Sequence, residues 1–392
     1  MPGKLRVGVV FGSRSVEHEV SIVTALQVYQ ALDRTKYEPV PIYITKTGQW
    51  LTGEKLGELK SYSDLKLIAE GERAILSPEP GSRELVVQGG GIFRKKANVQ
   101  VDVIFPCLHG TFGEDGTLQG LLELADVPYV GAGVVGSAVG MDKIIMKAAF
   151  RAAGLPTVNY TYFTRARWQR EPETTLDEVE AKLRYPLFVK PANLGSSVGI
   201  TRAVDRDGLR TALEVAASYD RRLLVEEGVE NVMEINCSVI GNDDPMPSVL
   251  EQPVAWQEFL SYEDKYLRGG KGEGMKGASR RIPAPISPEL TEKIQTLAVE
   301  AFKAVDCAGI ARIDVLVNEK TEEVFINEIN TIPGSLSFYL WEPSGVPFTE
   351  LTDRLIQLAL ERHAEKSRNQ YSFDTTILKK VAAGAKMGGA KA

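Results

Sequence analysis

Short apolar runs alternate with amphipathic stretches along the first third of the chain. Residues 6–11 form an apolar run that ends in a Gly-Ser turn, and residues 16–32 repeat apolar positions with the period of a helix. Glu17 and Glu19 fall in the first turn of that helix, where carboxylates are favoured. Further strands are predicted at 37–44 and 101–106, and a further helix from about 117 to 125. This alternation predicts an α/β domain whose loops gather at the carboxyl ends of its strands.

The pattern changes after residue 140. A helix is predicted from about 141 to 153, because Gly154 and Pro156 supply the usual stop signal. Later apolar runs predict strands at 187–190, 199–203, 223–226, 234–240, 248–254, 310–317 and 324–329, with helices at about 207–218, 287–305 and 352–366. The strands from 234 onward alternate apolar and polar residues, which predicts an antiparallel sheet with one packed face.

With 392 residues the chain exceeds the size at which one core usually stops growing, so we expect several domains. We predict an N-terminal α/β domain over 1–139, a central lobe over 140–226 and a C-terminal lobe over 227–366. Residues of about 50–97 are polar and interrupted by Gly and Pro, and we interpret them as a peripheral insertion. Residues 367–392 lack apolar periodicity and are expected to form a disordered tail.

The composition excludes several classes of protein. Charged residues make up 25% of the chain and the net charge is −6, so a nucleic-acid binder with a broad basic face is not expected. No apolar stretch reaches the roughly 18 residues of a membrane span, and the short apolar run at the start does not resemble a signal peptide. Three widely spaced cysteines suit neither a disulfide framework nor a zinc site, and are expected to be buried thiols. We therefore expect a cytoplasmic protein that binds neither nucleic acid nor membrane.

The most informative polar group lies on the last two predicted strands. Arg312 and Asp314 stand two apart on one strand, and Glu328 and Asn330 stand two apart at the end of the next. Residues two apart on a strand share a face, so we expect these side chains to point into one cleft. Either pair alone would suit solvated charges on an open sheet. Two carboxylates and an amide oxygen on neighbouring strands suit a hard cation such as Mg²⁺.

A Gly/Ser loop, residues 191–199 with the sequence PANLGSSVG, follows the strand that ends at Lys190. The successive N–H groups of such a loop can enclose phosphate oxygens, while Lys190 supplies a positive charge. A hairpin turn without a ligand is the alternative. Lys143, near the start of the helix predicted from 141, offers another phosphate contact.

Other candidate groups lie between the lobes and in the first domain. Glu226 and Glu234 flank the crossing between the two lobes, where a carboxylate can reach ribose hydroxyls, although surface glutamates would show the same pattern. Glu17 and His109 lie in first-domain loops, and the glycines after His109 permit close approach of the backbone to a small molecule. A purely structural role for His109 stays open. Residues 256–281, which hold five glycines, are predicted to be a lid or a disordered loop.

Eight motifs occur in a fixed order between about residues 5 and 365, namely EHEVS, HGTFGEDGT, MDK, VKPANLGSSVGI, VEEGVE, SYEDKY, ARIDV and NEINTIPG. In this order and at these distances they resemble the D-alanine–D-alanine ligases over nearly the whole chain. The resemblance implies an ATP-grasp fold of α/β and α+β type, in which a preATP-grasp domain precedes two lobes that hold ATP. It also implies an enzyme of peptidoglycan precursor synthesis, in which ATP phosphorylates one D-alanine and the amine of a second displaces phosphate.

The resemblance assigns roles to individual residues. Glu17 would anchor the ammonium of the first substrate, and Arg312 with the N–H of Gly334 would stabilise the oxyanion. Glu17, Ser196 and Tyr266 would form a hydrogen-bonded set that joins the first domain, the phosphate loop and the lid. Two Mg²⁺ ions, replaceable by Mn²⁺, would bind at Asp314, Glu328 and Asn330. The implied ATP contacts are Lys143, Lys190, Gly195, Ser196, Ser197, Val198, Glu226, Val229, Glu234 and Lys265, and the implied contacts to the amino-acid substrates are Glu17, His109, Lys265, Gly334, Ser337 and Tyr339.

One position departs from the family pattern. Members of the family carry a small hydroxyl residue after the Pro-Gly segment, where it helps to hold the carboxylate of the second substrate. Counting from Pro333 places Tyr339 at that position, and Ser337 lies two residues earlier. The resemblance therefore leaves D-lactate and D-serine as alternatives to D-alanine for the second substrate.

Two other classes of protein would share part of this pattern. A different ATP-grasp ligase would share the lysine and metal-ligand set but would have no reason for Glu17 and the HGTFGEDGT loop. A non-catalytic nucleotide-binding protein would not need Arg312 as an oxyanion donor. The partners that the resemblance implies are D-alanine, ATP and a second copy of the chain in a homodimer.

Overall fold

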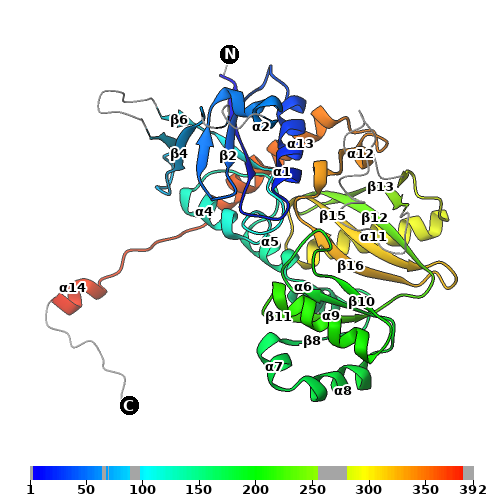
Figure 1. Cartoon of the computed structure of the whole chain (residues 1–392). Coiled ribbons are helices and arrows are strands. Elements are labelled where there is room, and N and C mark those ends of the chain that lie inside the picture. Colours follow the sequence, from blue (N-terminus) through cyan, green and yellow to red (C-terminus); the bar gives the residue numbers. More distant parts are fainter. Residues whose placement is uncertain (1–2, 64–67, 69, 89–97, 255–279, 383–392) are drawn as a thin grey trace.

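The computed structural model describes residues 3–63, 68, 70–88, 98–254 and 280–382. This part of the chain contains three sheets, which follow one another in sequence. Figure 1 shows the first sheet in blue to cyan, the second in green at the opposite end of the molecule, and the third, from light green (β12, β13) to orange (β15, β16), beside both. The domain boundaries predicted above stay a prediction.

The first sheet has seven strands in the order β6-β5-β4-β3-β2-β1-β7. β2 and β7 pair with β1 in parallel, and β3 to β6 extend the sheet in antiparallel fashion. The bounds are β1 Leu5–Gly12, β2 Tyr37–Ile44, β3 Trp50–Thr52, β4 Glu72–Leu76, β5 Glu84–Val87, β6 Val99–Gln100 and β7 Val103–Pro106, with helices α1 His18–Ala31, η1 Glu54–Gly57, α2 Lys60–Ser63 and α4 Thr117–Ala125.

The interpretation of residues 50–97 as a peripheral insertion stays a prediction, and the described residues of this range lie at one edge of the first sheet. β3, β4 and β5 continue the main sheet, and Leu85 on β5 is completely buried.

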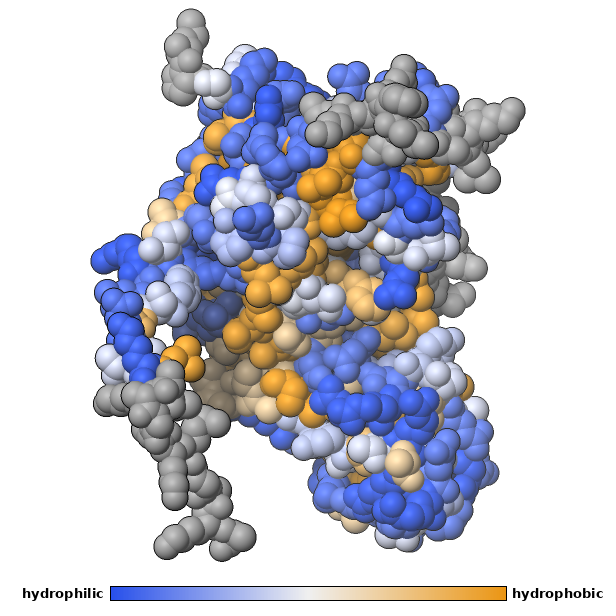
Figure 2. Space-filling view, turned by 90° about the vertical axis from the view of Figure 1, so that its left-hand side faces the viewer, coloured by the Kyte–Doolittle hydropathy of each residue, from blue (hydrophilic) through white to orange (hydrophobic). Residues whose placement is uncertain are grey.

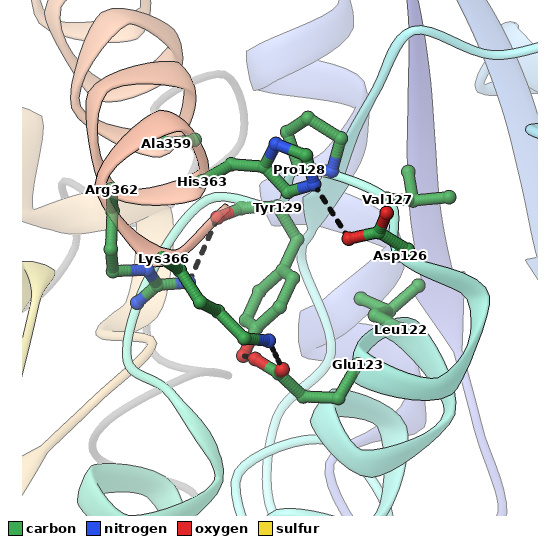
Figure 3. Close-up of a pocket in the computed structure, with 10 residues that line it drawn as sticks. All are labelled: Leu122, Glu123, Asp126, Val127, Pro128, Tyr129, Ala359, Arg362, His363 and Lys366. Atoms are coloured by element: carbon green, nitrogen blue, oxygen red, sulfur yellow. Dashed lines mark hydrogen bonds and ion pairs between the residues drawn. The ribbon is translucent and has the colours of Figure 1, made fainter. Parts of the chain in front are cut away.

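Alternate residues of β1 pack on opposite faces of the first sheet. Val7, Val9 and Phe11 join one core together with α1 and the C-terminal helix α13 (Phe348–Lys366), whereas Val10 joins another core with α4. The last helix of the compact body therefore returns to the first domain. Figure 3 shows this junction, where Arg362 of α13 donates to the carbonyl oxygen of Tyr129 at 3.2 Å.

The second sheet has four antiparallel strands in the order β10-β9-β11-β8. Its strands are β8 Tyr160–Thr164, β9 Leu187–Pro191, β10 Thr201–Ala203 and β11 Arg222–Glu227, and its helices are α7 Arg165–Arg170, α8 Pro172–Lys182 and α9 Arg206–Tyr219. The helix predicted from about 141 to 153 is confirmed as α6 Lys143–Ala152, and a further helix, α5 Val134–Met141, which was not predicted, precedes it. Asp142 separates them, because its side chain accepts from the N–H groups of Ile144 and Ile145 and so caps α6.

The third sheet has five antiparallel strands in the order β14-β13-β12-β15-β16. Its strands are β12 Val232–Gly241, β13 Met246–Pro253, β14 Arg280–Arg281, β15 Gly309–Asn318 and β16 Val324–Asn330. The long helix α11 (Pro288–Ala304) covers one face, where Ile294, Ala298 and Phe302 are completely buried. The short helices η3 (Gly334–Ser337) and α12 (Phe338–Trp341) follow β16 and lead to α13.

The chain after α13 departs from the compact body. The disordered tail expected from 367 onward is corrected in part, because residues Ile377–Ala382 form a short helix, α14, at the end of an extended segment (Figure 1). Leu, Lys and Ala favour helices, which accounts for this turn of helix without packing. Ile377 and Leu378 are 64% and 79% exposed.

The surface and interior agree with the composition in two respects. Cys107, Cys237 and Cys307 are buried and free, as expected. No helix among the described residues is long and apolar enough to cross a membrane. Figure 2 shows hydrophobic side chains gathered on the upper body of the molecule and mainly hydrophilic ones on the lower lobe, which holds the second sheet.

Candidate active site

The candidate metal ligands lie on the third sheet at directly paired positions. Asp314 on β15 pairs with Glu328 on β16, and Arg312 pairs with Asn330. Directly opposed residues of an antiparallel pair point to the same face, with Cβ atoms about 5 Å apart. The prediction that these side chains share one face is therefore confirmed.

Arg312 holds Asp314 by two hydrogen bonds. Its Nε donates to Asp314 Oδ1 at 2.6 Å and its Nη2 donates to Oδ2 at 2.8 Å, while Asn330 Nδ2 donates to Oδ2 at 3.0 Å. Burial opposes the charge of Arg312, but the neighbouring Asp314 outweighs burial and raises the pKa of the guanidinium. The carboxylate is therefore fixed in orientation while its partner stays charged.

The donors at this place are two carboxylates and one amide. Within the described ranges, no group of three or more His, Cys, Asp and Glu side chains is arranged to hold a metal ion. Mg²⁺ commonly takes only one or two protein carboxylates and completes its shell with phosphate oxygens and water. The paired carboxylates of Asp314 and Glu328 fit such an ion when it binds together with a phosphate-bearing substrate.

Lys143 connects α6 to the Gly/Ser loop. Its Nζ donates to the carbonyl oxygen of Leu194 at 2.8 Å and lies 3.7 Å from Glu328 Oε2. In the loop, Ser196 and Ser197 have positive φ angles of 53° and 59°. Turns with left-handed residues form the concave backbone nests that bind anions. The loop thus combines a nest-like backbone with a lysine at its base.

Lys190 shares one carboxylate with Lys147, a lysine that the sequence analysis does not single out. Lys190 Nζ lies 2.5 Å from Glu226 Oε2, and Lys147 Nζ lies 2.7 Å from Glu226 Oε1. All three side chains are buried. Burial would raise the pKa of Glu226, but the two ammonium groups outweigh burial and hold this pKa at about 2. Glu226 therefore stays ionised at neutral pH.

A β-bulge brings Lys147, Lys190 and Glu226 against β15 and β16, the strands of the candidate metal ligands. The register of β15 and β16 shifts directly after Asp314, so Asn327 has no partner in the ladder. Lys147 Nζ donates to its carbonyl oxygen at 3.3 Å, and Lys190 Nζ donates to its Oδ1 at 3.3 Å. The bulge therefore joins the third sheet to the lysines of α6 and β9.

Glu17 joins the first domain to the Gly/Ser loop. The hydroxyl of Ser196 donates to Glu17 Oε1, which is the contact predicted for this pair. A Cβ atom on Gly110 or on Gly195 would come within 2.5 Å or 2.6 Å of Glu17 Oε2. A Cβ atom at either position would press on this carboxylate, and Gly110 in addition has a positive φ of 70°, a conformation that favours glycine.

His109 and Glu114 hold the segment after β16 against the first domain. His109 Nδ1 donates to the carbonyl oxygen of Ile332 at 2.8 Å, and the N–H of Ile332 donates to Glu114 Oε1 at 2.8 Å. Thr24 Oγ1 lies 2.8 Å from His109 Nε2 and accepts from the N–H of Ser335 at 3.1 Å. Because a carbonyl oxygen only accepts, the ring proton is on Nδ1, and Nε2 accepts from Thr24.

The hydrogen bonds of His109 help to decide whether it contacts substrate or has a structural role. Burial lowers the pKa of His109 to about 4, so the ring is neutral, and both its nitrogens have protein partners. Burial and the charge of Glu17 raise the pKa of Glu114 to about 8. These contacts favour a structural role for His109, and its direct contact with substrate stays a prediction.

A left-handed turn follows Gly334. Ser335, Leu336 and Ser337 have φ angles of 51°, 52° and 48°. Left-handed backbone costs an L-residue about 1–2 kcal/mol, and such strain clusters at functional sites. The hydrogen bond from Ser335 to Thr24 holds this turn against α1. Gly334, the predicted oxyanion donor, is thereby placed at the junction of the first and third sheets.

Tyr339 forms a closed set with two residues of the third sheet. Its hydroxyl donates to Glu251 Oε1 at 3.1 Å, and the guanidinium of Arg280 lies 3.9 Å from the centre of its ring. Arg280 Nη1 lies 3.4 Å from Glu251 Oε2. Glu251 pairs with Asn236, which pairs with Asp314, so Glu251 lies on the same face and row as the metal-ligand candidates.

The remaining predicted residues fall into two groups. Lys265 and Tyr266 lie outside the described residues, together with most of the predicted lid. The other group is half-buried and lies in the Gly/Ser loop or at the crossing between the second and third sheets; its members are Gly195, Ser197, Val198, Val229 and Glu234. The roles of these residues stay predictions.

Two cavities lie away from these groups. One, between α4 and α13, is lined by Tyr129, Arg362 and His363 among others and has a volume of about 20 Å³ (Figure 3). It is large enough for little more than one water molecule. The other, of about 240 Å³, is lined by first-domain residues including Arg14, Trp50 and Phe112. Neither is lined by a predicted site residue.

Known proteins resemble the chain over nearly its whole length. Residues 6–132 match the family model of the D-ala D-ala ligase N-terminus, and residues 149–357 match that of the D-ala D-ala ligase C-terminus. The D-alanine–D-alanine ligase of Bacillus cytotoxicus is 45% identical over 375 residues, which cover 94% of this chain and 99% of that one. The D-alanine–D-alanine ligase of Geobacillus thermodenitrificans is 45% identical over 376 residues, which cover 95% and 100%.

Solved structures give the same picture. The D-alanine-D-alanine ligase from Coxiella burnetii superposes with a TM-score of 0.78 at 33% identity, covering 93% of this chain and 96% of that one. The VanG D-Ala:D-Ser ligase from Enterococcus faecalis superposes with a TM-score of 0.78 at 32% identity, covering 91% and 100%. Both likenesses therefore include all three sheets.

Proposed function

The chain belongs to the D-alanine–D-alanine ligase family, and from this premise we propose which of its residues carry each part of the reaction. The protein joins two D-alanine molecules in an ATP-dependent reaction that serves peptidoglycan synthesis. Its fold is of the ATP-grasp type. The observation that carries the assignment of roles is the meeting of all three sheets at one place, where Ser196 binds Glu17 and His109 binds Ile332.

The first step transfers the γ-phosphoryl group of ATP to a carboxylate oxygen of the first D-alanine, and ADP leaves. Charge neutralisation and alignment dominate such a transfer. Lys143, Lys190 and the N–H groups of residues 195–198 hold the phosphates. When bound at Asp314, Glu328 and Asn330, Mg²⁺ or Mn²⁺ supplies further positive charge to them.

The second step forms the peptide bond. The amine of the second D-alanine, after losing a proton, attacks the acyl carbon, and the bond from that carbon to the phosphate oxygen then breaks. The negative charge that develops on the carbonyl oxygen needs preorganised donors. Arg312 and the N–H of Gly334 take this role, and Glu17 holds the ammonium group of the first D-alanine.

The set around Tyr339 is proposed to recognise the second substrate. A D-alanine that attacks through its amine still carries a carboxylate, which must be compensated in a site with little water. The hydroxyl of Tyr339 is engaged by Glu251, whereas Arg280 stacks on the ring beside the metal-ligand row. We assign the compensating charge to Arg280, with Tyr339 fixing its position.

Arg280→Met is expected to raise the KM for the second D-alanine by about 10- to 100-fold, the scale of one lost charged hydrogen bond. ATP affinity should change by less than twofold. The matched control is Arg281→Met, because Arg281 is exposed and neighbouring residues of a strand point to opposite faces. Equal KM values in the two variants would remove Arg280 from substrate recognition. Initial rates over a range of D-alanine concentrations give this result.

The oligomeric state and the location of the protein in the cell are two further proposals. The protein acts on small molecules, and we propose that it does so as a cytoplasmic homodimer. Exposed apolar side chains on α4 and α5, such as Leu124 at 67% and Val135 at 56%, support a contact surface between copies.

The activity is tested with ATP, Mg²⁺ and a panel of D-alanine, L-alanine, D-serine and D-lactate. Phosphate release is expected only with D-alanine, and mass spectrometry should show D-alanyl-D-alanine as the main product. A larger yield of mixed product with D-serine or D-lactate would move the chain to a ligase of that specificity. ATP binding without release of phosphate would favour the non-catalytic alternative.

A further inference from the structure

Lys147 is a buried cation to which the reaction described above gives no role. It lies on α6, one turn after Lys143, and only 1% of it is exposed. A buried ammonium group is costly unless it is paired. Its partners are Glu226 Oε1 at 2.7 Å and the carbonyl oxygen of Asn327 at 3.3 Å. Because burying this ammonium group is unfavourable and Lys147 lies beside the proposed nucleotide site, we expect Lys147 to have a functional role.

The other carboxylate oxygen of Glu226, Oε2, forms an ion pair with Lys190, which is proposed to bind phosphate. The buried trio of Lys147, Lys190 and Glu226 therefore carries two positive charges and one negative charge. Without Lys147 the remaining pair would be neutral, and the carboxylate would compensate Lys190 alone. A Lys190–Glu226 pair without net charge attracts phosphate much less than the trio, which carries one excess positive charge.

The pKa values of the two lysines shift in opposite directions. Burial lowers the pKa of Lys147 from its ordinary value, an effect that the charge of Glu226 only partly offsets. For Lys190 burial acts in the same direction, but Glu226 and Glu328 outweigh it and raise the pKa. Lys190 is thus strongly held in its charged form.

We propose that Lys147 is a positioning residue for ATP, which neutralises Glu226 so that the charge of Lys190 stays available to the phosphate groups. Its bond to Asn327 also fixes the bulge of the metal-ligand strand against α6. Lys147 then acts through Lys190 and Glu226 without touching the substrate. The inference rests on the proposed function in one respect, namely that Lys190 binds phosphate.

The test compares the affinities of ATP and adenosine by calorimetry, because only ATP carries phosphate. Lys147→Met removes the charge and keeps much of the side-chain volume. We expect the Kd of ATP to rise about tenfold, the scale of one charged hydrogen bond, and that of adenosine to change less than twofold. Adding Glu226→Gln to Lys147→Met removes the negative charge that Lys147 balances, so the ratio of the two affinities should return towards the wild-type value.

A second variant separates charge from packing. Lys147→Gln keeps a hydrogen-bond donor for Asn327 without the charge, and should lower the ratio of ATP to adenosine affinity as Lys147→Met does, even if the Met variant folds poorly. Lys182→Met is the matched control, because Lys182 is an exposed lysine of α8 in the same part of the molecule. Thermal midpoints of all variants report the packing contribution.

Two results would overturn the inference. Equal weakening of ATP and adenosine in Lys147→Met and Lys147→Gln would show that Lys147 supports only the shape of the site. If the ratio of ATP to adenosine affinity is the same in the double variant Lys147→Met, Glu226→Gln as in Lys147→Met alone, then Lys147 does not act through the carboxylate of Glu226. Dipeptide synthesis by the wild-type protein is measured separately, so a failure of the proposed reaction would be seen without any of these variants.

Discussion

Glu328→Gln is expected to lower turnover by about 100- to 1000-fold, the scale on which one preorganised charge contributes to a transition state. Glutamine keeps the size of the side chain but removes one of the two carboxylates at the Asp314–Glu328 pair. The other, Asp314, is bound by Arg312 through two hydrogen bonds and does not replace it. D-alanine-dependent phosphate release, measured over a range of Mg²⁺ concentrations, should show both the loss and a higher requirement for the ion.

The control for this variant is Glu323→Gln. Glu323 is exposed and precedes the same strand, β16, by one residue, so it should keep wild-type turnover. The thermal midpoints of both variants should stay close to that of the wild type, because surface and half-buried substitutions of equal size usually change stability little. Normal turnover by Glu328→Gln at every Mg²⁺ concentration would contradict the assignment of Glu328 as a metal ligand.

The arrangement of the candidate metal ligands was predictable because the period of two in a strand is a strong local signal. Arg312 with Asp314 and Glu328 with Asn330 stand at that spacing, and the pairing of β15 with β16 brings them together. The bulge at Asn327 was not predictable. Nothing in the sequence around it distinguishes a residue without a ladder partner from its neighbours.

Lys147 was missed for a different reason. Lys143 and Lys147 are spaced by one helical turn, a pattern that is typical of a solvated helix face. Only tertiary structure shows that this face of α6 lies against Glu226 and the bulge at Asn327. The break before α6 did carry a local signal, because Asp142 is a favoured N-cap residue that could have been read as a helix start.

The other site residues that the sequence did not reveal make contacts with residues far away in the sequence. Glu114 lies within the HGTFGEDGT motif, but its partner Ile332 is 218 residues away, so the sequence around Glu114 gives no sign of this contact. Arg280 lies 59 residues before Tyr339 and shares no motif with it, although the two are stacked. Local patterns do not report such pairs. The hydrogen bond between Glu17 and Ser196, 179 residues apart, was expected only because the resemblance implied it.

Glu17→Gln is expected to raise the KM for the first D-alanine by about 10- to 100-fold, the scale of a hydrogen bond to a charged group. Glu17 is 6% exposed and is bound by the hydroxyl of Ser196, so its carboxylate faces the place where the first-domain loop and the Gly/Ser loop converge. Glutamine retains an oxygen that can accept from Ser196, so the Gly/Ser loop and the ATP affinity should change little. The loss should therefore fall on the ammonium group of D-alanine alone.

The experiment for Glu17 separates substrate binding from nucleotide binding. D-alanine saturation curves give the KM, and calorimetry with ATP gives the nucleotide affinity. Glu19→Gln is the control, because the side chain of Glu19 is 76% exposed in the first turn of α1, directly after Glu17 and His18. A large loss of ATP affinity with unchanged D-alanine saturation would place Glu17 in nucleotide binding instead. Equal losses in both would point to collapse of the junction between the two loops. A selective rise in KM is the result that requires a carboxylate opposite the substrate's ammonium group, because only that interaction depends on the charge that glutamine lacks.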